Sequence, residues 1–386
     1  MAVPRAASET GDPLLLTPGP LTTSKSVKAA MVHDWGSRDA NFVAINARMR
    51  QRLVAMIGGE GTFACVPMQG AGTFAVEAMV NAFVPQDGKL LVLVNGAYGK
   101  RIFHMCGYSG RAVARLDWAD DQPVDPASVA KALAADAAIT HVAVVHCETT
   151  SGILNPIAEV ARIVAAAGRK LLIDAMSAFG AIELDSRKVP FEAVAASSNK
   201  CIEGVPGLSF VLGRIDSLKQ TQGRSPSLAL DLHEQWQALE KTGQYRFTPP
   251  IHCIVAFDQA LTEHEEEGGV AGRGARYRSN WRTLTDGMRA LGFETLLPEA
   301  LQAPIIVTFR MPADPRFHFQ TFYDKLKDRG YVIYPGKLTA ADSFRIGCIG
   351  RLDESHMKGA LAAIRAAMAE MGVASGSPVR QAASAE

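Results

Sequence analysis

The sequence has no strong excess of one charge and no long apolar run. Its 386 residues include 40 Lys and Arg against 39 Asp and Glu, which gives a formal net charge of +1. A protein that binds nucleic acid through the phosphate backbone needs a clustered basic surplus, so we expect no nucleic-acid partner. The apolar segments, such as residues 90–94, are far shorter than the roughly 18 residues that a membrane-spanning helix needs. We therefore expect no membrane association.

Cysteine is sparse, and its spacing argues against two kinds of site. The six cysteines are scattered along the chain and form no CxxC pair, so a tight zinc site or a dithiol redox site is not expected. Six cysteines in so long a chain do not make a disulfide scaffold. The first residues also lack the hydrophobic stretch of a secretion signal. Together these features predict a reducing, cytoplasmic location.

Several catalytic motifs are missing as well. The sequence contains no GxSxG, HExxH or GxxxxGK[ST], and its nine histidines do not pair at metal-ligand spacing. His146 follows a strand pattern near Glu148, but an isolated pair of this kind is more often structural. We expect no metal site.

The apolar pattern predicts an α/β fold. Strand-like segments alternate with helical patterns, and several are apolar on both faces, as buried parallel strands are. The expected strands are 62–68, 89–94, 112–118, 141–146, 170–174, 193–198 and 208–213, and the helical patterns between them include 73–83, 126–135 and 156–167.

A change of pattern near residue 255 predicts a second, smaller α+β domain. We expect a large, mostly parallel α/β domain at 13–255 and a small domain at 256–373. Residues 13–30 form a segment that can pack on the small domain. The small polar residues of 1–12 and 374–386 predict disordered ends.

A glycine cluster lies between the first expected strand and its helix. Residues 70–75 (GAGTFA) match the looser G-x-G-x-x-A dinucleotide fingerprint, but no acidic residue follows at the end of the next strand. Two interpretations remain open: a helix N-terminus whose free backbone N–H groups bind one phosphate, or a tight turn without a ligand.

An acid and an amine follow two other expected strands. Asp174 ends the segment KLLID, and Lys200 follows the segment AVAASSN. If these strands are parallel neighbours, both side chains reach the sheet edge where ligands bind in open α/β sheets. An ordinary ion pair or a solvated lysine would also explain them. The small residues around Lys200, however, favour close approach of a ligand.

These groups together match the needs of pyridoxal phosphate. That cofactor requires an amine for its carbonyl carbon, a carboxylate for its ring nitrogen and an anion site for its phosphate. Tyr98, just beyond a strand, is placed to stack on the ring, although it can equally be a half-buried core residue.

The motifs that carry these residues resemble a known family. The chain is similar to the class V, fold type I pyridoxal phosphate-dependent aminotransferases, and within them to members that use 2-aminoethylphosphonate and pyruvate. The matching blocks span nearly the whole chain: LLLTPGPLTTSKSVKAAM (14–31), HDWGSRD (33–39), MQGAGTFAVEAM (68–79), NGAYGKR (95–101), HCETTSGILNP (146–156), DAMSAFGAIELD (174–185), SSNKCIEGVPGLSFVL (197–212), GQYRFTPPIH (243–252) and FRIGCIG (344–350).

The resemblance implies a role for each matched residue. Lys200 would bond covalently to the cofactor and move the proton, while Asp174 would pair with the ring nitrogen. Arg345 would bind the acidic group of the substrate. The other residues are implied to contact the cofactor or substrate: Ala71, Gly72 and Thr73 with Ser197 and Asn199 at the phosphate, Tyr98 and Met176 on the ring faces, Thr149 at the 3-oxygen, Gly19 and Arg38 at the substrate, and Tyr245 and Thr248 at the phosphate of the neighbouring subunit in a homodimer.

Some residues depart from the family pattern and leave alternatives open. Ala71 stands where many relatives carry serine, and Arg38 is unusual in its block. An alanine–glyoxylate, serine–glyoxylate or serine–pyruvate type of class V aminotransferase would share nearly every cofactor contact. A cysteine desulfurase-like lyase and a non-enzymatic cofactor-binding protein are further alternatives.

Overall fold

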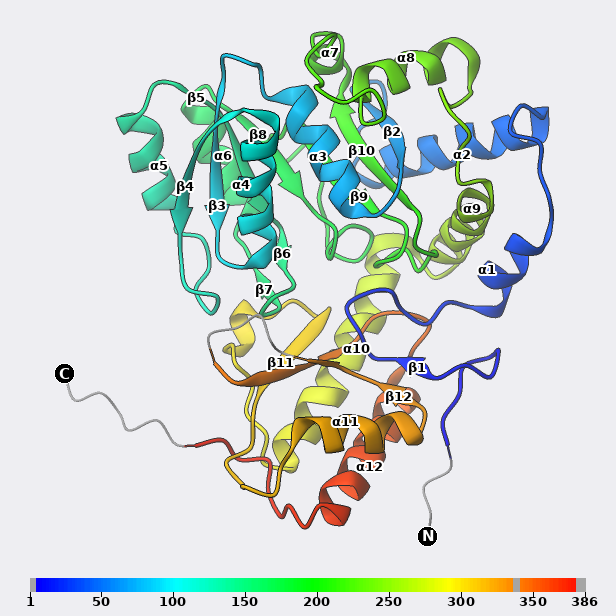
Figure 1. The fold of residues 1–386 in the computed structure, drawn as a ribbon, viewed down its shortest axis with the longest axis vertical. Helices are drawn as coiled ribbons and strands as arrows, with labels where there is room; N and C mark the ends of the chain where they lie inside the picture. Colours follow the sequence, from blue (N-terminus) through cyan, green and yellow to red (C-terminus); the bar gives the residue numbers. More distant parts are fainter. Residues whose placement is uncertain (1–4, 336–340, 380–386) are drawn as a thin grey trace.

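The computed structural model describes residues 5–335 and 341–379, and a large mixed sheet forms its centre (Figure 1). Within the described residues this sheet has seven strands. In spatial order they are β2 (Phe63–Gln69), β10 (Leu208–Arg214), β9 (Ala193–Ser197), β8 (Lys170–Asp174), β5 (Ile139–Val145), β3 (Lys89–Val94) and β4 (Ala112–Asp117). The strands from β9 to β4 run parallel, whereas β10 is antiparallel to both β9 and β2.

Helices cover both faces of this sheet, which explains why its strands are apolar throughout. Along β5, Val142 and Val144 enter the core on one face, while Ala143 and Val145 enter the core on the other. The first face is covered by α2 (Ala40–Met56), α5 (Pro126–Ala135), α6 (Ile157–Ala166) and α9 (Ile251–Glu266), and the second by α3 (Gly72–Phe83), α4 (Ala97–Ser109), the short α7 (Ile215–Leu218) and α8 (Leu232–Thr242).

A smaller unit follows in the chain and lies below the large sheet in Figure 1. Its antiparallel sheet has the order β11 (Ile306–Arg310), β14 (Ser343–Gly347) and β13 (Tyr334–Pro335). The helices α10 (Gly269–Ala290), α11 (Phe319–Asp328) and α12 (Glu354–Glu370) share one hydrophobic core with this sheet. Helix α10 begins beside the large sheet and extends into the small unit.

Short elements complete the described fold. Strand β1 (Leu14–Leu15) pairs in parallel with β12 (Tyr331–Val332), so the N-terminal segment packs on the small unit. The others are α1 (Lys25–Ala29), η1 (Ala30–Val32), β6 (Cys147–Glu148), β7 (Ile153–Leu154) and η2 (Glu299–Leu301). No helix among the described residues is long and apolar enough to cross a membrane.

The predicted α/β architecture with a mostly parallel sheet is confirmed. The expected boundary between residues 255 and 256 falls inside α9, which packs on α1, α2 and η1 beside the large sheet. A change in composition marks this helix but cannot reveal which core it joins.

Both chain ends extend further as ordered backbone than the sequence predicts. The amide of Ala6 donates to the carbonyl of Arg329, and the amide of Gly376 donates to the carbonyl of Leu291. Composition says nothing about such hydrogen bonds to distant segments. The remaining parts of the two predicted disordered ends, 1–4 and 380–386, lie outside the described residues, as do residues 336–340 of the expected small domain.

The aromatic core of the small unit gives a stability prediction. Phe293 is buried, and its ring contacts those of Phe309, Phe322 and Phe344. Phe293→Ala is expected to lower the free energy of unfolding by about 3–5 kcal/mol in denaturant titration, because it leaves a cavity. Tyr108→Ala, at an exposed aromatic side chain, should change it by less than about 0.5 kcal/mol. Equal effects of the two substitutions would contradict this packing.

Candidate active site

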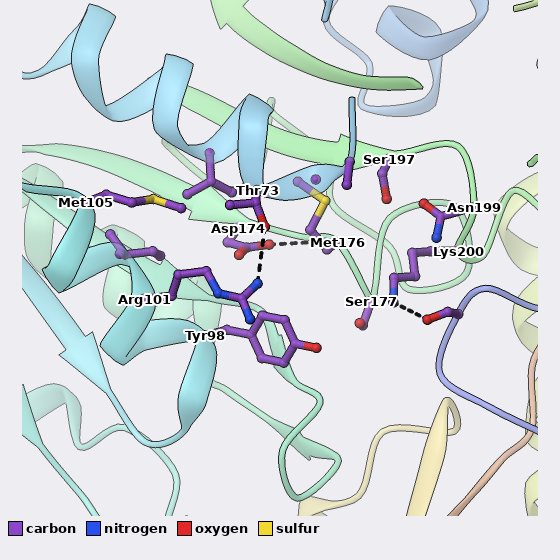
Figure 2. A pocket seen from close by; sticks show the side chains of 15 residues that line it. Thr73, Tyr98, Arg101, Met105, Asp174, Met176, Ser177, Ser197, Asn199 and Lys200 are labelled. Atoms are coloured by element: carbon purple, nitrogen blue, oxygen red, sulfur yellow. Dashed lines mark hydrogen bonds between the residues drawn. The ribbon is translucent and has the colours of Figure 1, made fainter. Parts of the chain in front are cut away.

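Two neighbouring parallel strands carry the acid and the amine to one cavity. Strand β8 ends at Asp174, and Lys200 lies in the turn that follows β9. The two strands pair directly, with Asp174 opposite Ala195. Both side chains line a cavity of about 200 Å³ at the carboxyl ends of the strands, as Figure 2 shows. The topology therefore brings together two residues that are 26 positions apart.

Asp174 is a buried carboxylate without a cationic hydrogen-bond partner among the described residues. Its side chain is 4% exposed, and its Oδ1 accepts a hydrogen bond from the amide of Met176 at 3.0 Å. Burial raises the pKa of Asp174 to about 6, although the Met176 hydrogen bond opposes the shift. The site thus contains negative charge that favours a cation in the cavity.

Lys200 is held by a backbone carbonyl and not by a carboxylate. Its Nζ donates to the carbonyl oxygen of Pro18 at 2.7 Å. Burial lowers the pKa of Lys200 to about 8, an effect that outweighs the nearby charge of Asp174. An amine with this pKa is partly neutral near physiological pH and can act as a nucleophile or base.

The N-terminus of α3 forms the next wall of the cavity. Ala71 is its N-cap residue and offers no side-chain hydrogen bond, so the first backbone N–H groups of the helix remain available to an anion. Gly72 packs closely against Met176: a Cβ at position 72 would lie 2.4 Å from Sδ of Met176, so a larger residue there would require the Met176 side chain to move. The Thr73 hydroxyl also lines the cavity. These free N–H groups suit the anion site that the sequence left open beside a simple turn, and phosphate binding there remains a prediction.

An aromatic side chain and an arginine stand together on another wall. Tyr98 belongs to the first turn of α4, and the guanidinium of Arg101 lies 4.9 Å from the centre of its ring. Arg101 also donates to Oγ1 of Thr73 at 3.2 Å (Figure 2). The buried carboxylate of Glu148 accepts hydrogen bonds from the amides of Tyr98 and Gly99 and thereby fixes this end of α4.

Arg345 does not line the cavity but interacts electrostatically with Tyr98, and it has no ion-pair partner within the described residues. It is 2% exposed, in β14 of the small unit. Its guanidinium donates to the carbonyl oxygens of Thr149 at 2.8 Å and Pro335 at 2.9 Å and stacks on the ring of Tyr334. Burial lowers its pKa. A buried arginine that bonds only to carbonyls keeps an unpaired charge for an acidic ligand.

Thr149 is linked to the cavity through another hydroxyl. Its Oγ1 is 3.0 Å from the Oγ of Ser177, and it is Ser177 that lines the cavity. Since the carbonyl of Thr149 also binds Arg345, this residue connects the arginine to the cavity wall.

Most of the residues singled out in the sequence meet in this one cavity. Those that line it are Gly19, Ala71, Gly72, Thr73, Tyr98, Asp174, Met176, Ser197, Asn199 and Lys200. Gly19 approaches so closely that a Cβ there would lie 2.7 Å from Cδ of Lys200. Five others do not line it: Arg38, Thr149, Tyr245, Thr248 and Arg345.

Three of these five lie away from both the cavity and Arg345. Arg38 and Thr248 are exposed. The hydroxyl of Tyr245 is buried without a hydrogen-bond partner among the described residues, near Cys65 and Arg50. Their predicted contacts with substrate or with the neighbouring subunit's cofactor remain predictions.

Five residues that line the cavity escaped the sequence analysis: Val76, Arg101, Ile102, Met105 and Ser177. The sequence carries a signal for the two polar ones. Arg101 lies three positions after Tyr98, a spacing that puts both on one face of a helix. Ser177 lies three positions after Asp174, in the same small-residue turn. The described residues contain no group of three His, Cys, Asp or Glu side chains arranged for a metal ion.

The raised pKa of Asp174 leads to a test on the ligand-free protein. The native carboxyl ionises near pH 6 and the unfolded one near 3.8. The charged native form is therefore destabilising above pH 6, and this penalty disappears as the pH falls through 6 towards 4. Asp174→Asn is expected to raise the free energy of unfolding at pH 8 by up to about 3 kcal/mol, with no gain at pH 4.

The measurement is thermal or chemical unfolding at both pH values. Asp314→Asn is the control, because Arg316 lowers the pKa of Asp314 to about 2 and the substitution should not stabilise the protein. A loss of stability at pH 8 in the Asp174 variant would contradict an uncompensated buried charge.

Comparison with known proteins agrees with this geometry. Residues 22–356 match the family model "Aminotransferase class-V". The chain is 54% identical over 361 residues to 2-aminoethylphosphonate–pyruvate transaminase 2 of Burkholderia lata, covering 94% of this chain and 96% of the relative. It is 55% identical over 369 residues to the 2-aminoethylphosphonate–pyruvate transaminase of Rhizobium meliloti, covering 95% and 96%.

Solved structures show the same fold at lower identity. Alanine–glyoxylate aminotransferase from Nostoc sp. superposes with a TM-score of 0.86 at 22% identity, covering 95% of this chain and 96% of that one. Pyridoxamine–pyruvate aminotransferase from Mesorhizobium loti gives 0.85 at 23% identity, covering 95% of each chain. The sheet topology, the cavity and the family match lead to one conclusion: this chain belongs to the class V aminotransferase family.

Proposed function

We propose that this aminotransferase uses pyridoxal phosphate to transfer the amino group of 2-aminoethylphosphonate to pyruvate. The products are phosphonoacetaldehyde and L-alanine. The observation that carries the proposal is that Lys200, in the cavity, and Arg345, near Tyr98, form no ion pair within the part of the chain that the structure describes. Lys200 is an amine that suits reaction with a carbonyl group. Arg345 suits binding of an acidic group on the substrate. The two relatives described above are both 2-aminoethylphosphonate–pyruvate transaminases, which supports this choice of substrates.

The cavity fits pyridoxal phosphate at each of its functional groups. Asp174 supplies the negative charge for a protonated ring nitrogen, and the start of α3 supplies N–H donors for a phosphate. Tyr98 and Met176 provide the two walls for a flat ring. When bound, the cofactor supplies an electron-accepting ring that stabilises negative charge on the carbon next to the amine.

Lys200 is the residue that moves the proton. Its Nζ lies in the cavity, and its pKa of about 8 leaves a useful fraction of neutral amine near neutral pH. An unperturbed lysine, with a pKa of about 10.4, would be almost fully protonated under the same conditions. The carbonyl of Pro18 accepts a hydrogen bond from Nζ and orients it. Burial of the amine thus prepares it as a base.

Asp174 acts at the opposite end of the ring. A carboxylate in this buried position stabilises a proton on the ring nitrogen, because charge pairs interact strongly where water is excluded. The amide of Met176 holds the carboxylate oxygen in place. The sulfur of Met176 packs against the start of α3, close to Gly72. Met176 thus connects the proposed ring site to the proposed phosphate site.

Arg345 binds the two acidic groups in turn. The guanidinium is planar and can form two parallel hydrogen bonds to either a phosphonate or a carboxylate. Its present partners are carbonyl oxygens, which leave its charge uncompensated. Stacking on Tyr334 keeps its plane fixed. One arginine can therefore serve both half-reactions.

The proposal includes a homodimer with shared sites in the cytoplasm. Tyr245 and Thr248, which the family resemblance assigns to the partner's phosphate site, do not reach the cavity of their own chain. Phe74, next to Thr73, is an exposed aromatic side chain at the start of α3, which suits a subunit contact. The free thiols of all six cysteines fit a reducing compartment.

The geometry of the site gives less support to the alternative functions. A desulfurase needs a mobile, reactive thiol, yet burial raises the pKa of Cys201, the cysteine next to Lys200, to about 12. An alanine–glyoxylate, serine–glyoxylate or serine–pyruvate aminotransferase would use the same cofactor site. The amino donor that reacts distinguishes such an enzyme from the one proposed.

The amino donor and the role of Arg345 are tested together. Each candidate donor (2-aminoethylphosphonate, alanine, serine, phosphoserine) is added alone to the holoenzyme, and cofactor absorbance reports amine transfer. 2-Aminoethylphosphonate should react most efficiently. Arg345→Lys should lower kcat/KM about tenfold or more for both 2-aminoethylphosphonate and pyruvate, because the paired hydrogen bonds are lost.

Arg310→Lys, on the neighbouring strand of the same small sheet, is the control and should leave both values unchanged. Reaction with alanine and serine alone would refute the phosphonate assignment. Unchanged kinetics in the Arg345 variant would remove this residue from substrate binding.

Arg101 is proposed to bind the cofactor's phosphate, because its guanidinium contacts Thr73 at the start of α3. Arg101→Ala is expected to weaken binding of pyridoxal phosphate to the apoprotein about tenfold, the size of one charge-assisted contact. Pyridoxal, which lacks the phosphate, should lose no affinity. Lys100→Ala removes an exposed positive charge from the same helix and should affect neither compound. Equal losses for both compounds in a calorimetric titration would place Arg101 elsewhere.

A further inference from the structure

The turn that carries Lys200 continues into a buried ionic cluster. Glu203, three positions later, is 3% exposed and has the left-handed φ of 64° that non-glycine residues rarely adopt. Its carboxylate accepts hydrogen bonds from the hydroxyl of Tyr277 at 2.5 Å and from the guanidinium of Arg276 at 2.8 Å. The guanidinium of Arg273 lies 3.5 Å away and donates to the carbonyl of Cys201. Side chains of helix α10 therefore bind the turn that contains Lys200.

The same face of α10 also binds the segment that follows β14. Arg276 donates to the carbonyl oxygens of Gly350 at 2.6 Å and Leu352 at 2.7 Å. The amide of Gly350 donates to the hydroxyl of Tyr277. Arg345 lies within β14, only a few residues before this segment. One guanidinium thus bonds both to the turn after Lys200 and to the segment after Arg345.

The charges in this cluster are fully matched. Glu203 and Glu267 face Arg273 and Arg276, two acids against two bases. Removing one member leaves an uncompensated buried charge, which is strongly unfavourable. Such a network permits only one arrangement of its members. It is therefore suited to fixing the distance between the two segments that it binds, the one after Lys200 and the one after Arg345. In Figure 1, α10 runs from the large sheet into the small unit, so it physically joins the two parts that supply Lys200 and Arg345.

We propose that Arg276, Glu203 and Tyr277 are positioning residues that set the separation between Lys200 and Arg345. That separation sets an upper limit on substrate length: it admits amines whose acidic group lies up to two carbons from the nitrogen and disfavours longer ones. The inference rests on the proposed function, because it gives Arg345 the acidic end of the substrate and Lys200 the amine end. The cluster touches neither substrate nor cofactor and acts only through the two segments that it binds.

Chain-length selectivity is the readout that a merely structural role would not change. The measured quantity is the ratio of kcat/KM for 2-aminoethylphosphonate to that for 3-aminopropylphosphonate, which is one methylene longer. A rigid site discriminates one methylene about 10- to 200-fold. Arg276→Lys keeps the charge but loses the fork that reaches both segments, and should lower this ratio at least about fivefold, mainly through KM.

Two further variants make the test independent of folding problems. Tyr277→Phe removes one hydroxyl and keeps all four charges, and should lower the ratio in the same direction by a smaller factor. Glu192→Gln is the matched control: this buried carboxylate binds Lys170 and His141 next to the start of β9, the end of the strand remote from Lys200. It should lower the melting temperature and leave the ratio unchanged.

A double-mutant cycle separates positioning from general damage. In an Arg345→Lys background, Arg276→Lys should lower kcat/KM for 2-aminoethylphosphonate by less than about twofold further, because coupled residues are not additive. Additive losses, or an unchanged ratio in folded Arg276 and Tyr277 variants, would overturn the inference. A wild-type enzyme that does not react with 2-aminoethylphosphonate would instead overturn the proposed function, so the two failures are distinct.

Discussion

The site depends on the burial of an acid and an amine that do not neutralise each other. Asp174 and Lys200 lie at the ends of adjacent strands, yet their closest polar partners are backbone groups. Burial therefore shifts their pKa values in opposite directions, to about 6 and about 8. Each charge is costly until a ligand with complementary groups enters the cavity. The free energy of ligand binding can then offset a penalty already present in the fold.

The surrounding structure keeps these two groups apart and in place. Close packing of Gly72 against Met176 and of Gly19 against Lys200 leaves no room for a side chain at either glycine. Glu148 binds the amides at the start of α4 and so determines where Tyr98 stands. These contacts come from segments that are distant in the sequence. A rigid wall of this kind holds a flat ring in one orientation.

A second constraint joins the large sheet to the small unit. Arg345 belongs to the small sheet, but the geometry that makes it useful involves Thr149 and the Lys200 turn of the large one. The ionic cluster on α10 spans this junction. In the proposed function, the cofactor chemistry of Lys200 and the substrate binding of Arg345 therefore depend on how the large sheet and the small unit are held relative to each other.

Local sequence patterns are enough to predict the class of fold and the chemical groups of the candidate site. Apolar strands with alternating helices require a covered parallel sheet, and Asp174, Lys200 and the glycine cluster carry signals that are local in the chain. Thr149 shows the limit of local signals. The motif identifies the residue, but only the tertiary structure shows that its hydroxyl lies 3.0 Å from that of Ser177, which lines the cavity, while Thr149 itself does not. The tertiary structure likewise decided that α9 joins the large core and that Glu203 pairs with α10. Burial and long-range pairing decide these features, and neither is encoded by the spacing of neighbouring residues.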